Sequence, residues 1–513
     1  RGHSCLDMAA TLQAPDFVLS LPPEGDAGDP LPSQWLAGLD AGQWRQALAS
    51  NALVEDQDAG QRFPERPLVL QGQRLYLRRY WNYERSIAQA LSRRLRAETA
   101  APEGLAGRLD ALFPQAFEID GQRRTDWQKV ACALAARGNF SIITGGPGTG
   151  KTTSVVRLLG LLQIPAVQAG APLRIRLAAP TGKAAARLSE SIGRAVSELP
   201  VEGAVRVAVP TEVSTLHQLL GSRPGSRNFI HGRDRPLELD VLVVDEASMI
   251  DLEMMARLLE ALPRQARLVL LGDKDQLASV DAGSVLGDLC RDAEAGGYSA
   301  QTVAWLQAHS GETLEAPGLR MADGPGDPLA QQTVMLRHSR RFDAGNGIGR
   351  LARLVNEQNA AQARALLGQG VPQLFNLDLR SGRSAALTGL IVGGAGDAPG
   401  YRRYLEQMQS LRPAKDAARN GQAWPIWAGR VLAAFDEFRL LCALRRGPWG
   451  VEGLNQRAAA ELRRCGLLAG DRDWYEGRPV LVTRNDYSLN LMNGDIGIAL
   501  QVPDQAGEMV LRV

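Results

Sequence analysis

The residues of this chain with the clearest chemical purpose are a glycine-rich stretch that ends in a lysine. Residues 145–152 read GGPGTGKT, which fits the phosphate-binding loop pattern GxxxxGK[ST]. The chain has 53 arginines and five lysines, so Lys151 is not its usual choice of positive charge. A slim ammonium group can reach between the β- and γ-phosphates of a nucleotide, where the planar guanidinium of arginine would not fit. We therefore predict a nucleotide site made of Gly145, Gly146, Pro147, Gly148, Thr149, Gly150, Lys151, Thr152 and Thr153.

The segments on either side of this loop support the same interpretation. Residues 140–144 are apolar and β-branched, which predicts a buried strand, and residues 152–162 carry apolar side chains at helical spacing. In such a strand–loop–helix unit, the glycines let the backbone wrap the phosphates and the helix N-terminus points N–H groups at them. The alternative is a glycine-rich turn that matches the pattern by chance, and the lysine and both flanking elements argue against it.

A pair of adjacent carboxylates follows a second predicted strand. Asp245 and Glu246 come directly after residues 240–244, at the strand end where open α/β sheets bind ligands. We predict that Asp245 holds Mg²⁺, directly or through water, and that Glu246 polarises the attacking water of a hydrolysis reaction. Taken alone, the pair could equally be an acidic strand end that faces solvent. Its place about 90 residues after a phosphate loop favours the catalytic interpretation.

Two more predicted strands lead into polar turns. The strand at 267–271 continues into Gly272–Leu277, where Gln276 is placed to contact the γ-phosphate or the catalytic water. The strand at 174–179 continues into Pro180, Thr181, Gly182 and Lys183, a second turn with N–H groups and a lysine. Such a turn suits a nucleic-acid phosphate, although an ordinary strand–helix turn is about equally probable.

Two further groups of residues are weaker candidates. Thr215 and His217 could extend the nucleic-acid track with a hydroxyl and an imidazole, although a lone histidine is more often a packed, hydrogen-bonded residue. Arg341, in the stretch Ser339–Phe342, is a candidate arginine finger that reaches the γ-phosphate from a second domain. An Arg-Arg pair is otherwise usually a solvated surface feature.

Length and composition describe a multidomain globular chain. Its 513 residues suggest three or four domains, and a net charge of +2 neither requires nor excludes nucleic acid. No apolar run approaches the roughly 18 residues of a membrane helix. The five cysteines are far apart and form no CxxC motif, which is typical of reduced cysteines in a cytoplasmic protein.

The order of the predicted elements indicates an α/β fold in several parts. Residues 1–110 should form a mainly helical module, with a small hairpin at 68–77 and an arginine-rich patch at 78–81 that is either a docking or nucleic-acid surface or a solvated helix start. Residues 111–330 alternate strand and helix, as in a parallel sheet. Residues 331–478 resume mixed character, and residues 479–513 turn to strands, as in a small β-rich insertion for which an SH3-like fold is one option.

These motifs, taken in order, resemble the superfamily 1 helicases, and their wording is similar to the RecD branch, the α subunit of exodeoxyribonuclease V. The strings GGPGTGKT, APTGKAAARL and VVDEASMIDL are the most distinctive, and the similarity spans residues 122–500. The resemblance implies two RecA-like lobes, at 111–330 and 331–513, that bind ATP and Mg²⁺ between them. It also implies an N-terminal domain that docks on a RecC-like partner.

The resemblance assigns roles to individual residues. Gln128 would contact adenine, Lys151 and Thr152 would handle phosphate and Mg²⁺, and Gln276 and Arg341 would sense the γ-phosphate. The chain would move 5′→3′ on single-stranded DNA from duplex ends, within a heterotrimer with RecB-like and RecC-like subunits that repairs double-strand breaks and degrades linear DNA. The DNA contacts implied are Pro180, Thr181, Gly182, Lys183, Thr215, His217 and Asn493.

The chain departs from the family pattern at its end. A late His-Lys-Ser-Gln-Gly string and a Thr-Arg-Ala string do not occur in it, so we expect an incomplete second lobe. Two alternatives stay open: a freestanding helicase, and a nucleotide-binding structural subunit without helicase activity. The structural subunit would need neither Glu246 nor Gln276 nor Arg341. A nuclease role is not indicated, because the sequence shows no second carboxylate cluster.

Overall fold

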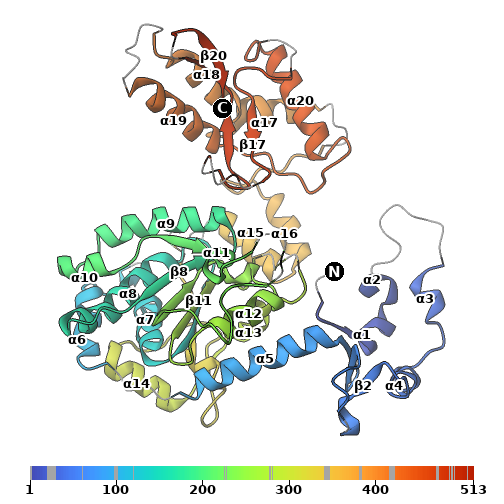
Figure 1. Cartoon of the computed structure of the whole chain (residues 1–513). Coiled ribbons are helices and arrows are strands. Elements are labelled where there is room, and N and C mark those ends of the chain that lie inside the picture. Colours follow the sequence, from blue (N-terminus) through green and yellow to red (C-terminus); the bar gives the residue numbers. More distant parts are fainter. Residues whose placement is uncertain are drawn as a thin grey trace. The chain divides into compact units, whose positions relative to one another are not determined.

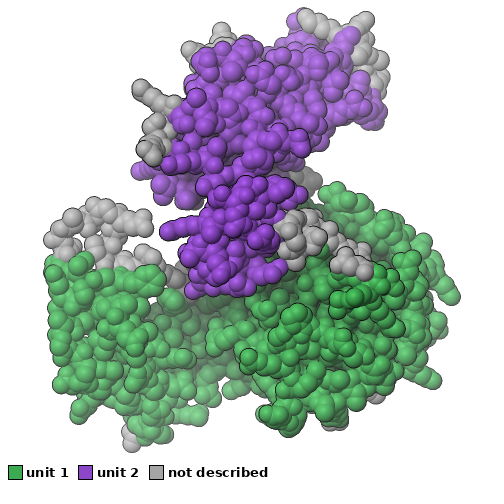
Figure 2. All heavy atoms as spheres, turned by 180° about the vertical axis from the view of Figure 1, so that it is seen from behind, with its two compact units in different colours: residues 1–341 green, residues 342–513 purple. Residues whose placement is uncertain are grey.

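The chain falls into two compact units, residues 1–341 and 342–513, in a computed structural model (Figure 2). Each unit is described by itself. No helix in the described part of the chain is long and apolar enough to cross a membrane. The structure describes residues 3–19, 30–60, 62–97, 102–119, 121–223, 226, 228–276, 279, 281–339, 347–379, 384–414, 422–469, 473–484, 486, 489, 491–504 and 506–513.

A six-stranded sheet in which all neighbours are parallel forms the centre of the first unit (Figure 1). All four strands predicted between residues 140 and 271 are confirmed. Their residues are mostly apolar because the strands are largely buried on both faces, with the exposed Arg176 of β8 as an exception. In sheet order the strands are β14 (Thr333–Leu336), β7 (Phe140–Gly145), β11 (Arg267–Gly272), β10 (Val241–Val244), β8 (Ile175–Ala179) and β9 (Val213–Thr215).

Helices cover both faces of this sheet. Successive residues of β7 show the alternation, because Ile143 packs into one hydrophobic core and Ile142 into the other. On the Ile143 side lie α6 (Leu105–Leu112), α7 (Trp127–Arg137), α8 (Lys151–Gln168), α9 (Gly182–Ser197) and α14 (Ala300–Ser310). On the Ile142 side lie α5 (Arg78–Leu95), α11 (Leu216–Leu220), α12 (Leu252–Ala261) and α13 (Val285–Leu289). The short α10 (Gly203–Ala208) contacts α8.

The N-terminal module contains more strand than we predicted. The predicted hairpin is confirmed as antiparallel β3 (Leu68–Gln71) and β4 (Arg74–Leu77). Two three-residue strands, β1 (Cys5–Asp7) and β2 (Val54–Asp56), extend it to the order β1-β4-β3-β2, so a four-stranded sheet accompanies the helices of this module. Strands this short are held by pairing to the hairpin and leave no visible alternation in the sequence. The helices are α1 (Met8–Gln13), α2 (Pro15–Leu19), α3 (Pro32–Trp35) and α4 (Ala41–Ala49).

Helix α5 joins this module to the large sheet. At its start, Arg78 forms an ion pair of 2.7 Å with the buried Glu55 of β2, so the first arginine of the predicted patch is structural. Near its end, the buried Arg94 donates hydrogen bonds to the carbonyls of Leu262 (3.2 Å) and Pro263 (3.1 Å), just beyond α12. Both ends of the helix are thus fixed by arginines that bond to groups inside the protein, while the buried Nε of Arg94 has no hydrogen-bond partner among the described residues.

The boundary after the first lobe lies further along the chain than we predicted. We expected this lobe to end at residue 330, but β14 adds residues 333–336 to its sheet by parallel pairing with β7. The first unit ends at Arg341. The Gly- and Pro-rich stretch before β14 misled the prediction, because a connection of that composition precedes this strand within the lobe.

The second unit is built from helices and antiparallel ribbons. The helices within residues 385–464 pack around the buried Trp427, and the described residues of this unit form no parallel strand pair, so the predicted second RecA-like lobe is not found among them. The apolar residues of this region follow helical spacing and pack helix against helix. The helices are α15 (Gly347–Asn356), α16 (Ala360–Leu367), α17 (Ala385–Gly393), α18 (Arg402–Ser410), α19 (Ala423–Asp436) and α20 (Val451–Arg464).

The last residues of the chain form strands, as we predicted. They pair as two antiparallel ribbons, β17 (Pro479–Leu481) with β18 (Ile496–Ile498) and β19 (Leu500–Pro503) with β20 (Met509–Arg512). The SH3-like arrangement stays a prediction.

Candidate functional site

The residues that follow five strands of the large sheet lie at the same edge of the sheet. Because β7, β11, β10, β8 and β9 are parallel to their neighbours, their carboxyl ends lie together. The phosphate loop follows β7, Gln276 follows β11 by four residues, and the carboxylate pair follows β10. The predicted nucleic-acid turns follow β8 and β9. The structure therefore brings these groups of the first unit to a single edge.

The phosphate loop has the backbone that its glycines predict. Gly148 and Gly150 have φ values of +77° and +87°, in the left-handed region that glycine adopts without strain. The loop ends where α8 begins, at Lys151. The Lys151 ammonium donates to the carbonyl of Gly145 at 2.6 Å and to that of Gly146 at 3.4 Å. The ammonium group therefore already lies over the loop, where a bound phosphate would replace these carbonyls as its hydrogen-bond acceptor.

The carboxylate of Asp245 is buried beside this loop. Burial raises its pKa to about 6, as does the nearby Glu246 carboxylate, while the backbone N–H of Glu246 and the Lys151 ammonium oppose the rise. Its Oδ1 atom is buried and accepts no hydrogen bond within the described residues. An orphaned carboxylate oxygen fits a divalent cation, because hard cations such as Mg²⁺ take oxygen ligands.

Glu246 has a strained backbone. Its φ of +51° lies in the left-handed region, which is uncommon for residues other than glycine and costs roughly 1–3 kcal/mol. It precedes a short 3-10 turn, Ala247–Met249, that leads into α12. The turn lies against β11, because a Cβ atom added to Gly272 would lie 3.4 Å from the backbone nitrogen of Ala247. The surrounding structure therefore holds the Glu246 conformation in place.

Gln128 lies against the phosphate loop. It is the second residue of α7, whose N-cap Asp126 accepts hydrogen bonds from the backbone N–H groups of Gln128 and Lys129. The Gln128 amide donates to the carbonyl of Thr149 in the phosphate loop at 3.0 Å. Lys129 has a structural role instead, since it pairs with Asp110 of α6 at 2.8 Å.

A small cleft beside Gln128 contains residues that we did not predict. The Phe117 and His338 rings close it, with centroids 5.2 Å apart, and the Arg337 guanidinium lies 4.8 Å from the Trp127 ring. Burial lowers the pKa of His338, as do the charges of Arg337 and Arg124. The sequence gives no sign of Phe117, but His338 directly precedes the Ser339 motif and could have been included with it.

The two predicted γ-phosphate sensors are placed differently. Gln276 is exposed in the turn after β11, where its backbone N–H bonds to the carbonyl of Asp273 at 3.2 Å. Arg341 lies outside the described residues. The motif that contains it does reach the loop, because the Ser339 hydroxyl donates to the carbonyl of Pro147 at 2.8 Å.

The predicted nucleic-acid turns serve as helix caps. The Thr181 hydroxyl accepts from the backbone N–H of Ala184 at the start of α9, and Lys183 is half-buried in the first turn of that helix. Thr215 forms a capping box with Gln218 at the start of α11. The exposed His217 ring packs edge-on against Phe229, with centroids 5.8 Å apart.

Asn493 belongs to the second unit and is described only within it. It is exposed, in a turn between β17 and β18, where the backbone N–H of Gly494 bonds to the carbonyl of Val482 at 2.8 Å. Its role in DNA binding stays a prediction.

A parallel sheet with a phosphate loop after one strand and paired carboxylates after another defines a P-loop nucleotide-binding domain. Residues 128–282 match the model of an AAA domain, and residues 1–76 match the model of the N-terminal domain of the RecBCD enzyme subunit RecD. A relative from Haemophilus influenzae, a RecBCD enzyme subunit RecD, is 37% identical over 89% of this chain and 70% of its own length. The chain therefore belongs to the RecD family.

Other relatives support the same assignment. The RecBCD enzyme subunit RecD of Mycolicibacterium smegmatis is 38% identical over 91% of this chain and 70% of its own. The ATP-dependent RecD2 DNA helicase of Deinococcus radiodurans is 32% identical over 70% of this chain and 36% of its own. A solved structure of Pif1 helicases at forked double-stranded DNA covers 76% of both chains with a TM-score of 0.32 and 14% identity, too slight a likeness to support an argument. As a RecD-family member, the chain is an ATP-dependent DNA helicase.

Proposed function

We propose that this chain is a motor subunit that moves 5′→3′ on single-stranded DNA, within a RecBCD-type assembly that processes broken DNA ends. The observation that supports the proposal is the shared edge, because the candidate nucleotide residues and the predicted nucleic-acid turns follow strands of one sheet. Residues after β7 and β10 would bind and hydrolyse ATP, while residues after β8 and β9 would contact DNA. A conformational change at the nucleotide site can then be transmitted through the sheet to the DNA site.

The ATP site would work through the groups already in place. Lys151 would leave the Gly145 carbonyl to bind the β- and γ-phosphates, and the N-terminus of α8 would add N–H donors. Asp245 and Thr152 would hold Mg²⁺, which neutralises phosphate charge. Glu246 would orient and polarise the attacking water, and Gln276 and Arg341 would respond to the γ-phosphate. Gln128 would hold the adenine beside Thr149.

The DNA track would follow the tops of β8 and β9. The N-terminus of α9, with Pro180, Thr181, Gly182 and Lys183, suits a backbone phosphate. Thr215 and His217 would continue the track, and Asn493 would contribute from the second unit. Contacts of this kind read the backbone and stack on bases, so affinity should fall steeply with salt and depend little on sequence.

The proposed partners are RecB-like and RecC-like chains, and the cytoplasm is the proposed location. The match of residues 1–76 to a RecD N-terminal domain supports the partner assignment, because that segment contains none of the nucleotide motifs. A module fixed to the ATPase core through α5 is suited to hold the motor in a complex. A freestanding helicase would need no such partner.

The proposal can be tested with a single substitution and a matched control. Lys151→Gln removes the ammonium group that would bind phosphate, so we expect DNA-stimulated ATPase of the full-length protein to be lost while the circular-dichroism spectrum stays unchanged. Lys415→Gln makes the same chemical change at the lysine outside every motif and should keep full activity. Unchanged ATPase in Lys151→Gln would contradict the proposal.

Direction and partner dependence need a second assay. Strand displacement on duplexes with 5′ or 3′ single-stranded tails, with and without the co-purifying chains, measures both at once. We expect unwinding from 5′ tails. Unwinding that is just as fast without partners would favour the freestanding helicase, and ATP binding without any unwinding would favour the structural subunit.

A further inference from the structure

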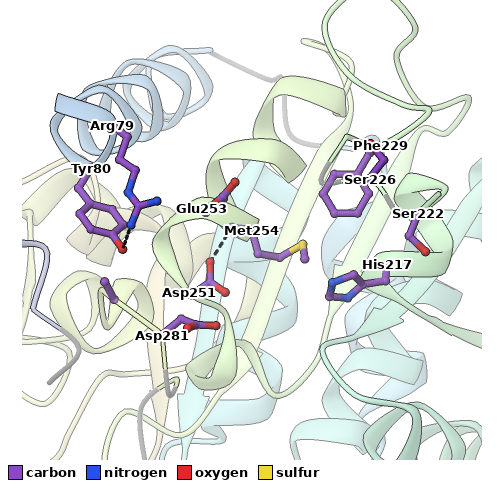
Figure 3. A pocket seen from close by; sticks show the side chains of 11 residues that line it. Arg79, Tyr80, His217, Ser222, Ser226, Phe229, Asp251, Glu253, Met254 and Asp281 are labelled. Atoms are coloured by element: carbon purple, nitrogen blue, oxygen red, sulfur yellow. Dashed lines mark hydrogen bonds between the residues drawn. The ribbon is translucent and has the colours of Figure 1, made fainter. Parts of the chain in front are cut away.

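A cavity of about 450 Å³ lies next to the predicted DNA track in the first unit (Figure 3). Its size is within the roughly 300–1,000 Å³ typical of small-ligand pockets. Four elements form its wall: the start of α5, the start of α12, the end of α11 with the loop behind it, and residues 281–282. His217 of the predicted track is one of its lining residues, so whatever occupies the cavity lies within reach of that track.

One side of the cavity offers flat apolar surfaces. The His217 and Phe229 rings pack edge-on there, and Figure 3 shows the Met254 side chain pointing toward the His217 ring. The hydroxyls of Ser222 and Ser226 lie on the same side. Aromatic faces of this kind stack on nucleobases whatever the sequence.

The middle of the cavity is acidic, and one of its carboxylates has no hydrogen-bond or ion-pair partner among the described residues. Asp251 caps α12 by accepting from the backbone N–H of Met254 at 2.7 Å. Glu253 is engaged by the Tyr83 hydroxyl and by Arg257, whose guanidinium lies 3.9 Å away. The exposed Asp281 carboxylate makes no hydrogen bond or ion pair within the described residues, which leaves its acceptors for a ligand.

One arginine lines the cavity and a second follows a lining residue in the sequence. On the α5 side, Arg79 is exposed, and its guanidinium lies 4.6 Å from the Tyr80 ring and donates to the Tyr80 hydroxyl at 3.0 Å. On the side of the His217 and Phe229 rings, the exposed Arg223 follows the lining residue Ser222 in the sequence and does not itself line the cavity. The site thus combines positive margins, aromatic surface and an acidic centre.

We propose that this cavity receives one nucleobase of the bound DNA strand and prefers bases that carry an exocyclic amine. The base would stack against Phe229 and His217, its amine would donate to Asp281, and Arg79 or Arg223 would contact the phosphate. Cytosine offers an N4 amine where thymine offers a carbonyl, so the carboxylate accepts from one and repels the other. This inference rests on the proposed function and adds a local base preference to it.

The distribution of charge favours a nucleotide over a basic side chain of a protein partner. A lysine or arginine would be attracted by the acidic centre but repelled by Arg79 and Arg223 on entry. A nucleotide is complementary to both regions, because its phosphate is anionic and its amine edge is a donor. The aromatic pair also suits a base better than an ammonium group on a flexible stem.

The test is the affinity of the full chain for (dC)12 and (dT)12, measured by fluorescence anisotropy at fixed salt. We expect the wild type to bind (dC)12 about fivefold to tenfold more tightly, as a carboxylate–amine contact discriminates by roughly that factor. Asp281→Ala should bring the ratio close to one, mainly by weakening (dC)12. Phe229→Ala should weaken both oligonucleotides alike, because stacking does not distinguish them.

A matched control separates base recognition from net charge. Asp288→Ala removes a carboxylate of the same unit that pairs with Arg291 on the surface, so it should leave the (dC)12 to (dT)12 ratio at the wild-type value. A wild-type ratio of one, or a ratio that Asp281→Ala leaves unchanged, would overturn the proposal. The affinity for a hexa-arginine peptide is measured in the same way. If Asp281→Ala lowers the affinity for this peptide and not for the oligonucleotides, the cavity binds a basic protein side chain and the proposal is wrong.

The outcome also separates this inference from the proposed function. If both oligonucleotides bind equally and stimulate ATPase, the motor assignment stands and the base pocket is wrong. If neither binds nor stimulates ATPase, the proposed function itself is contradicted.

Discussion

Gly150 should not accept a side chain, because two separate features of the phosphate loop oppose it. Its φ of +87° lies in the left-handed region, and a Cβ atom there would lie 2.1 Å from the Gln128 amide nitrogen. The flexible end of Gln128 can move away, but the move would break its hydrogen bond of 3.0 Å to the Thr149 carbonyl. Gly150→Ala therefore combines backbone strain with a lost contact between α7 and the phosphate loop.

The two contributions can be estimated separately. Left-handed backbone costs about 1–2 kcal/mol for an alanine, and a lost hydrogen bond costs about 0.5–1.5 kcal/mol. Gly170 has a φ of +72° with no atom within 4 Å of its added Cβ, so Gly170→Ala should show the strain alone. Gly146 has neither positive φ nor a close neighbour, so Gly146→Ala should have almost no effect on stability.

The assay is hydrogen exchange of peptides from α7 and α8, which reports local opening without assuming two-state unfolding of a chain with two units. A double-mutant cycle compares the wild type with Gly150→Ala, Gln128→Ala and the variant that carries both substitutions. The hydrogen bond can be lost only once, so the double variant should be destabilised by about 0.5–1.5 kcal/mol less than the sum of the single variants. Strict additivity, or equal effects of Gly150→Ala and Gly170→Ala, would refute the reasoning.

Three further predictions concern charged groups of the first unit. Burial favours the neutral acid of Glu55, but hydrogen bonds from the Arg78 side chain and from a backbone N–H outweigh it and lower the pKa of this carboxyl. The charged form therefore stabilises the fold above the ordinary pKa of glutamate. This stability is lost as the pH falls through the lowered pKa. Glu55→Gln should therefore destabilise the module by about 3–5 kcal/mol at pH 7, measured by hydrogen exchange of peptides from β2 and α5, and this cost should shrink as the pH falls below the ordinary pKa of glutamate. Because burial and nearby arginines lower the pKa of His338, the wild type should lose thermal stability relative to His338→Gln as the pH falls below about 6.5. Arg94→Met should lower the free energy of unfolding by about 1.5–3 kcal/mol, since the buried guanidinium donates to backbone carbonyls at the end of α12.

The sequence was sufficient to predict four of the six strands of the central sheet because these strands are mostly buried, whereas the short edge strands β9 and β14 were not predicted. Such strands are continuous apolar runs, as in Val241–Val244, and the polar residues after them mark the edge where ligands bind. The phosphate loop was equally predictable, since Gly148 and Gly150 occupy positions that favour glycine. These local rules are confirmed by the positions of β7, β10 and β11.

Contacts between distant residues could not be predicted in the same way. Phe117 and His338 are more than two hundred residues apart, and only the fold places their rings 5.2 Å from each other. Strands of three residues such as β1 and β2 carry too little pattern to be recognised. The second unit was misjudged for a related reason, because apolar residues that pack helix against helix around Trp427 do not by themselves reveal whether a parallel sheet lies among them.

The conformation of the phosphate loop depends on side chains as well as on its glycines. Three donors bind its backbone carbonyls: Lys151 that of Gly145, Ser339 that of Pro147, and Gln128 that of Thr149. They come from the start of α8, the segment after β14 and the start of α7, so three separate elements hold the loop. Because these carbonyls are already satisfied, the loop N–H groups are left to meet an anion. A nucleotide that moves Lys151 or Gln128 on binding would therefore change the contacts that hold the loop. The same loop bonds to Ser339, which lies two residues before the first unit ends.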